Sequence, residues 1–110
     1  MQLGVPKEIK AQEFRVGMTP AGVRELVSAG HTVLIESGAG DAIGLTDDLY
    51  RAAGATVVET AEQVFTESDM IVKVKEPQPH ECQQLRPEQL LFTYLHLAAD
   101  PMQAALLMKS

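Results

Sequence analysis

The segment TPAGVRELVSAGHTVLIE, residues 19–36, contains the pattern that decides the fold. Thr19 suits the N-cap of a helix, Pro20 its first position and Gly30 the position just past its end. Between them, apolar residues recur at the spacing of one helical face. The β-branched and apolar run HTVLIE that follows is typical of a strand. The segment therefore predicts a helix that leads directly into a buried strand.

The same alternation continues on both sides of this segment. Strands are predicted at residues 1–5, 31–36, 55–59, 69–75 and 90–95. A short helix is expected from Thr46 to Gly54, another after Thr60, which can form a capping box with Gln63, and a last one over residues 100–110. Strands joined by helices imply parallel pairing with right-handed crossovers. The sequence predicts an α/β fold, a mostly parallel sheet with flanking helices, in which the apolar runs MIV and LLF are covered on both faces.

Length and composition exclude several classes of protein. A chain of 110 residues fits one domain, residues 1–110, and a hydrophobic fraction of 45% is ordinary for a globular protein. The formal net charge is −6 and no basic stripe occurs, so nucleic acid is not expected as a partner. No apolar run approaches the roughly 18 residues that span a bilayer, and the start lacks the apolar core of a signal peptide. The single cysteine, Cys82, builds no disulfide or zinc site, so we expect a cytoplasmic protein without a metal.

A glycine-rich stretch, IESGAGDAIG, follows the second predicted strand. It resembles the dinucleotide-binding fingerprint, but Ile43 stands where the third glycine should be. The next helix also begins beyond the loop, at Thr46. We therefore interpret Gly38, Gly40 and Gly44 as members of a flexible loop with positive φ angles, and expect no nucleotide site in this chain.

Polar residues stand at the carboxyl ends of the predicted strands, where open parallel sheets bind ligands. Lys75 and Glu76 end the fourth strand and His96 ends the fifth, with Tyr94 on the same face by period-2 alternation. A histidine in such a place can act as general acid and base, and a lysine can polarise a carbonyl group. Lys73 has the same parity as Lys75, and the pattern alone does not separate them.

Arg15 lies in the loop after the first predicted strand, hence on the same edge of the sheet. Its guanidinium could clamp a carboxylate through two parallel hydrogen bonds. With Lys75 near a keto oxygen and His96 exchanging a proton, the set would suit a small 2-oxo acid. The alternatives are a solvated arginine, an arginine paired with Glu8 or Glu13, and a histidine that is merely hydrogen-bonded.

Three stretches resemble a known family: VPKEIKAQEFRVGMTPAGV, DMIVKVKEPQP and LLFTYLHLAADP. They are similar to the N-terminal part of the alanine dehydrogenases, a family shared with the α-subunit of pyridine nucleotide transhydrogenase, and the resemblance covers essentially all 110 residues. TYLHLA favours the alanine dehydrogenase branch. The resemblance implies that Arg15 binds the substrate carboxylate, that Lys75 rather than Lys73 binds substrate, and that His96 is the catalytic acid and base.

The resemblance also implies a reaction: reversible, NAD-dependent oxidative deamination of L-alanine to pyruvate and ammonia by a homo-oligomer. In the family, a second, Rossmann domain carries the true glycine fingerprint and a catalytic aspartate, and this chain stops before both. We therefore expect an incomplete, Rossmann-like substrate-side domain that is inactive alone, since hydride transfer needs a bound nicotinamide. The alternatives are part of a transhydrogenase α-subunit and a truncated, non-catalytic module that binds a carboxylate or serves assembly.

Overall fold

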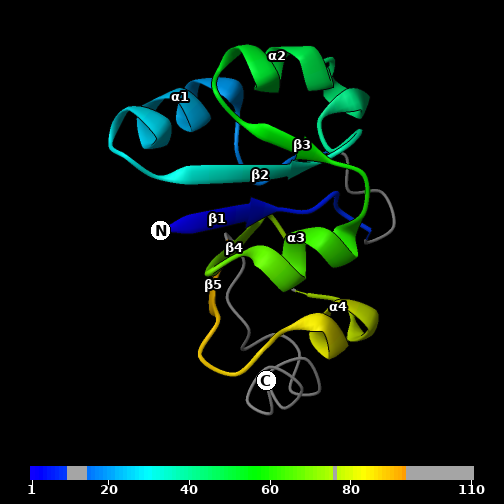
Figure 1. The fold of residues 1–110 in the computed structure, drawn as a ribbon. Coiled ribbons are helices and arrows are strands. Elements are labelled where there is room, and N and C mark those ends of the chain that lie inside the picture. Colours follow the sequence, from blue (N-terminus) through cyan, green and yellow to red (C-terminus); the bar gives the residue numbers. More distant parts are fainter. Residues whose placement is uncertain (10–14, 76, 94–110) are drawn as a thin grey trace.

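The structure, a computed structural model, describes residues 1–9, 15–75 and 77–93. These residues contain a five-stranded, all-parallel sheet in the order β3-β2-β1-β4-β5 (Figure 1). The strands are β1 (Gln2–Val5), β2 (Thr32–Glu36), β3 (Thr56–Val58), β4 (Met70–Lys73) and β5 (Leu90–Thr93). The predicted α/β fold with a parallel sheet is confirmed.

Helices connect the successive strands. They are α1 (Pro20–Ser28), α2 (Asp47–Ala52), α3 (Ala61–Glu67) and α4 (Pro79–Gln84), with a short 3₁₀ helix η1 (Asp41–Ile43) before α2. The threonine caps are confirmed, because the side chains of Thr19, Thr46 and Thr60 each accept a hydrogen bond from a backbone N–H in the first turn of their helix. Each cap satisfies an N–H group that the helix itself leaves without a partner.

The sheet carries a separate core on each face. Val33 and Ile35 of β2 share one core with Tyr50 of α2, whereas Ile71 of β4 shares the other with Phe65 of α3. Accordingly, α1 and α2 lie together on one side of the sheet, and α3 and α4 lie on the other (Figure 1). The sheet thus lies between two layers of helices.

The structure corrects three details of the prediction. β4 ends at Lys73 rather than Lys75, because the chain bends at residues 74 and 75. The run LLF is not covered on both faces: it lies in the edge strand β5, where Leu90 and Phe92 are about half exposed, at 49% and 50%. Helix α4 was not predicted at all. The expected end of the fifth strand and the expected helix over residues 100–110 lie outside the described residues.

Candidate functional site

The carboxylate of Glu8 joins the loop after β1 to the end of β4. Its Oε1 accepts hydrogen bonds from Lys73 Nζ at 3.0 Å and from the backbone N–H of Lys75 at 3.2 Å. Its Oε2 accepts from the backbone N–H of Val74 at 3.1 Å. β1 and β4 are neighbours in the sheet, so a side chain just beyond one strand reaches the other directly. Glu8 therefore connects the chain after β1 to the chain at the end of β4, at the carboxyl edge of the sheet.

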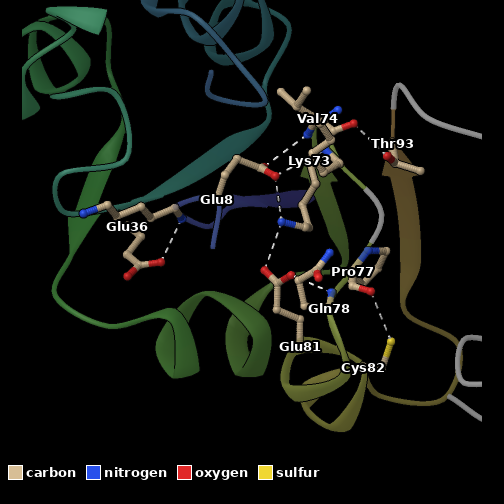
Figure 2. Close-up of polar contacts among 11 residues, drawn as sticks. Glu8, Glu36, Lys73, Val74, Pro77, Gln78, Glu81, Cys82 and Thr93 are labelled. Atoms are coloured by element: carbon tan, nitrogen blue, oxygen red, sulfur yellow. Dashed lines mark hydrogen bonds and ion pairs between the residues drawn. The ribbon is translucent and has the colours of Figure 1, made fainter. Parts of the chain in front are cut away.

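Lys73 lies between two carboxylates (Figure 2). Its ammonium group is 3.0 Å from Glu8 Oε1 and 2.9 Å from Glu81 Oε2, and its side chain is only 1% exposed. Glu81 lies in α4, where its other oxygen accepts from the backbone N–H of Gln78 at 2.9 Å. A buried ammonium needs such partners, because an unpaired charge would be strongly destabilising. Lys73 thus has an internal structural role in pairing with these two carboxylates.

The segment that carries Lys75 is held on several sides. The Val74 carbonyl oxygen accepts a hydrogen bond of 3.1 Å from the Thr93 hydroxyl at the end of β5. Farther along, the Pro77 carbonyl oxygen accepts from the Cys82 thiol at 3.7 Å. The Cys82 side chain is buried, and burial raises the pKa of its thiol, which is consistent with a structural cysteine. The Lys75 side chain is partly buried at the carboxyl edge predicted for it.

Arg15 is exposed, and the loop that follows it packs onto β4. A Cβ atom at Gly17 would lie 2.5 Å from the Val72 carbonyl oxygen, so the two backbones touch where only glycine fits. Tyr50 fixes the next residue, Met18, by donating a hydrogen bond of 2.6 Å to its carbonyl oxygen. The chain segments that bear Arg15 and Lys75 are thus both anchored at the carboxyl end of β4.

The third predicted residue is not placed. His96, its predicted neighbour Tyr94 and also Glu76 lie outside the described residues. The last described residue of β5 is Thr93, three positions before His96. The roles assigned to Arg15, Lys75 and His96 therefore remain predictions.

The sequence prediction missed Glu8, Glu81 and Thr93 as parts of this edge. Glu8 was considered only as a possible partner of Arg15. The rule that ligands and polar residues gather at the carboxyl ends of parallel strands could have pointed to Glu8 as well, since it closely follows β1. No local signal could have identified Glu81 as the second partner of Lys73, because α4 carries few apolar residues and was itself not predicted.

The carboxylate of Glu36, at the end of β2, adds negative charge near this network (Figure 2). It accepts a hydrogen bond of 2.8 Å from the backbone N–H of Lys7. Burial raises the pKa of this carboxyl, while the Lys7 N–H and the Lys7 charge act in the opposite direction. Glu36 therefore anchors the backbone next to Glu8.

The glycine-rich loop after β2 is not arranged for a pyrophosphate. The N–H of Gly38 donates to Asp47 Oδ1 at 2.9 Å, and the N–H groups of Ala39, Asp41, Ile43 and Gly44 donate to carbonyl oxygens of the chain itself. Hydrogen bonds from Ser37 and Gly38 lower the pKa of Asp47, so a negative charge stands at the loop. Gly38 and Gly44 have positive φ as predicted, but Gly40 does not; it is needed because a Cβ there would lie 2.6 Å from the Leu45 carbonyl oxygen.

The described residues also form an uncharged groove. A groove between α1 and the ends of β4 and β5 is lined by Val16, Met18, Leu26, Val72 and Phe92, with Gly17, Thr19 and Gly22. None of these lining residues is charged, so the groove offers no cationic side chain to a carboxylate. Within the described residues, no cluster of His, Cys, Asp and Glu could hold a metal ion. No described helix has the length and apolar character needed to cross a membrane.

The chain is similar in sequence to known alanine dehydrogenases. The chain is 54% identical over 100 residues to an alanine dehydrogenase of Mycobacterium tuberculosis, which covers 91% of this chain and 27% of that protein. It is 50% identical over 101 residues to the alanine dehydrogenase of Bacillus subtilis, covering 92% of this chain and 26% of the relative. The chain thus spans about a quarter of the length of these relatives.

Solved structures agree with the sequence comparison. A structure of L-alanine dehydrogenase superposes with a TM-score of 0.94 at 54% identity, covering 99% of this chain and 30% of that one. A transhydrogenase from Sinorhizobium meliloti superposes with a TM-score of 0.89 at 28% identity, covering 97% of this chain and 32% of the other. Residues 4–110 match the family described as the N-terminal domain of alanine dehydrogenase and PNT. The sequence, the parallel sheet and these matches together show that this chain belongs to the alanine dehydrogenase/PNT N-terminal domain family.

Proposed function

We propose that this chain supplies the substrate-binding side of an NAD-dependent L-alanine dehydrogenase, which converts L-alanine, NAD⁺ and water to pyruvate, ammonia and NADH. The observation that carries the proposal is the anchoring of the Arg15 and Lys75 segments at the same end of β4, by Gly17 and Glu8 respectively. Two cationic side chains at the carboxyl edge of a parallel sheet suit a small anionic substrate. The identity to proteins named alanine dehydrogenase supports alanine and pyruvate as that substrate pair.

Each residue has a distinct proposed role. The Arg15 guanidinium binds the substrate carboxylate through paired hydrogen bonds, which fixes the orientation of the small molecule. The Lys75 ammonium lies at the keto oxygen of pyruvate and stabilises the negative charge that develops there. His96, neutral in the deamination direction, accepts a proton and returns it in the amination direction. These three roles belong to side chains of this chain.

A bound NAD⁺ would supply the acceptor for the hydride that leaves C2 of alanine. The glycine loop of residues 38–44 does not fit its pyrophosphate, because the Gly38 N–H is already donated to Asp47 and that carboxylate would repel phosphate. We therefore assign the nucleotide to another part of the full-length protein and expect this chain alone to be inactive.

A role in a transhydrogenase is the second candidate, favoured by the superposition on the Sinorhizobium meliloti protein. Identity to that protein is 28%, against 54% to the L-alanine dehydrogenase structure, so the alanine dehydrogenase is preferred. The two candidates differ in a simple observable. An alanine dehydrogenase reduces NAD⁺ only when L-alanine is added, whereas a transhydrogenase exchanges hydride between two nucleotides without an amino acid.

The test is steady-state kinetics of the full-length protein, followed by NADH absorbance. His96→Ala is expected to lower kcat by roughly 10²- to 10⁴-fold, the contribution of a positioned acid and base. Arg15→Ala should act chiefly on KM for alanine and pyruvate, because a carboxylate clamp binds ground and transition states alike. Lys75→Ala should change both constants. Absence of alanine-dependent NAD⁺ reduction, or normal turnover by His96→Ala, would refute the assignment.

A further inference from the structure

We propose that Glu8 is a positioning residue, which fixes the backbone of Lys75 so that its ammonium group meets the substrate. The inference rests on the function proposed above, because it takes Lys75 as a substrate-binding residue. Glu8 itself is buried, at 7% exposure, and acts through the chain rather than on the substrate.

The contacts of Glu8 are directed at two successive residues of the segment after β4. The N–H groups of Val74 and Lys75 point to different oxygens of one carboxylate, at 3.1 Å and 3.2 Å. A carboxylate that accepts two neighbouring backbone N–H groups fixes the orientation of both peptide planes, since each hydrogen bond is directional. The Cα atom of Lys75, from which its side chain extends, lies next to these planes.

Glu8 can fix the position of this segment because contacts of its own and of its neighbour Lys7 fix the position of Glu8. The backbone N–H of the preceding residue, Lys7, donates to Glu36 Oε1 at 2.8 Å. The Lys73 ammonium, 3.0 Å from Glu8 Oε1, neutralises the buried carboxylate from the other side. Glu8 is thus a rigid bridge from the ends of β1 and β2 to the segment after β4.

A purely structural explanation would be that Glu8 serves only to neutralise the buried Lys73. The chain contains the comparison that separates the two explanations. Glu81 also pairs with Lys73, at 2.9 Å, and is likewise buried, but its other oxygen accepts a hydrogen bond from the N–H of Gln78 rather than from residues 74 and 75. Neutralising Glu8 or Glu81 removes one ion pair of Lys73 in either case. Only the change at Glu8 also disturbs the N–H groups at Val74 and Lys75.

The variant Glu8→Gln has the shape of the native side chain but only one acceptor oxygen. Its NH₂ group must then face an N–H of Val74 or of Lys75, donor against donor. The Lys75 segment would shift, and small displacements of a group that binds substrate are costly to the reaction.

The experiment compares Glu8→Gln, Glu81→Gln and Glu25→Gln in the full-length protein, where exposed Glu25 in α1 controls for the loss of one negative charge. The expected result is that Glu8→Gln raises KM for pyruvate about tenfold, a displacement effect on substrate binding. Glu81→Gln should lower the urea midpoint of unfolding but leave this KM unchanged, and Glu25→Gln should change neither. Equal KM values for Glu8→Gln and Glu81→Gln would overturn the proposal.

A double-mutant cycle with Lys75→Ala tests whether Glu8 acts through Lys75. In the Lys75→Ala background, Glu8→Gln should add no further increase in KM, because the side chain that it positions is gone. A full additional increase would overturn the inference. If Glu8→Gln does not fold, Glu8→Asp keeps the charge near Lys73 but shortens the reach to the backbone, and the same KM signature is expected.

Failure of this inference can be told apart from failure of the proposed function. If Lys75→Ala alone leaves KM and kcat unchanged, the substrate role of Lys75 is wrong. If Lys75→Ala is damaging while Glu8→Gln behaves like Glu81→Gln, the role of Lys75 stands and the positioning role of Glu8 is wrong.

Discussion

The hydroxyl group of Thr93, at the end of β5, donates a hydrogen bond of 3.1 Å to the carbonyl oxygen of Val74, just beyond the end of β4. Val74 is thereby bound on both sides, since its N–H group donates to Glu8. Thr93 stands three residues before His96, and Val74 immediately precedes Lys75. This contact connects the two chain segments that carry the proposed acid/base and the proposed substrate lysine.

Thr93→Val should therefore lower kcat in the full-length protein, by about three- to tenfold, because the fixed spacing between the two segments is lost. Valine has the shape of threonine without the hydroxyl donor. Thr93→Ser keeps the donor and should retain most of the activity. If serine and valine variants were equally impaired, packing of the threonine methyl group rather than this hydrogen bond would be responsible.

Lys73→Met should destabilise the fold strongly, whereas Lys75→Met should have a much smaller effect on stability. Removing the Lys73 ammonium leaves Glu8 and Glu81 as uncompensated buried carboxylates, a change that costs about 3–5 kcal/mol in the free energy of unfolding. Urea unfolding of both variants measures the difference. A Lys73 variant is consequently not a neutral control for the kinetics of a Lys75 variant, although the two lysines have the same parity in the strand pattern. A similar loss of stability in the two variants would contradict the assigned roles.

Gly17→Ala should move the loop that carries Arg15. The new Cβ would lie 2.5 Å from the Val72 carbonyl oxygen and 2.9 Å from its carbonyl carbon, and backbone atoms cannot easily give way. A loss of about 1–3 kcal/mol is expected from such overpacking, with a raised KM for pyruvate. Gly22→Ala in α1 is the matched control, since its Cβ would meet side chains rather than backbone, the flexible Met18 side chain at 3.2 Å and the Thr19 hydroxyl oxygen at an ordinary 3.8 Å. Equal stability of the two variants would show that Gly17 is not in close contact with β4.

Tyr50 makes the stability of the fold depend on pH in the alkaline range. Burial raises the pKa of its phenol to about 12, above its ordinary value of about 10. Between these values the unfolded chain releases this proton while the folded chain keeps it, so stability is complete below pH 10 and falls as the pH rises toward 12. Tyr50→Phe should be less stable below pH 10, by about 1 kcal/mol, because the hydrogen bond to Met18 is lost. The stability gap between the two proteins should narrow above pH 10 and reverse before pH 12, because a pKa difference of about two corresponds to roughly 2.7 kcal/mol, more than the hydrogen bond contributes. A constant gap would contradict this account.

Residues 1–110 alone should bind no NADH in a calorimetric titration. Most N–H groups of residues 38–44 donate to acceptors within the chain, and the Asp47 carboxylate opposes a pyrophosphate. Saturable binding at micromolar concentration would show that this loop, or another part of the chain, accepts the nucleotide.

Local sequence signals were sufficient for most of the fold. Thr19, Thr46 and Thr60 mark helix starts because a cap is a short-range interaction between a side chain and the next turn. Helix α4 was not predicted because it lacks a periodic apolar face. It does carry two start signals, Pro79 at its first position and Glu81, whose carboxylate accepts from the Gln78 N–H.

The candidate site was predictable only in part. The position of Lys75 follows from the rule for the carboxyl ends of parallel strands. The burial of Lys73 does not follow, because its partner Glu8 is 65 residues away and the bend after β4 ends the strand alternation. Long-range pairing of this kind depends on the register of β1 against β4, which a single sequence does not reveal.

The central place of β1 has a consequence for the order of assembly during synthesis. β1 is made first, yet one of its two neighbours, β4, begins at residue 70. On a ribosome, β1, β2 and β3 can associate early with α1 and α2. The edge of β1 that later pairs with β4 then still has unpaired backbone groups. We therefore expect the nascent chain to expose one unpaired edge of β1 until β4 is made, so that slow translation ahead of β4 would prolong the period in which that edge can pair with another chain.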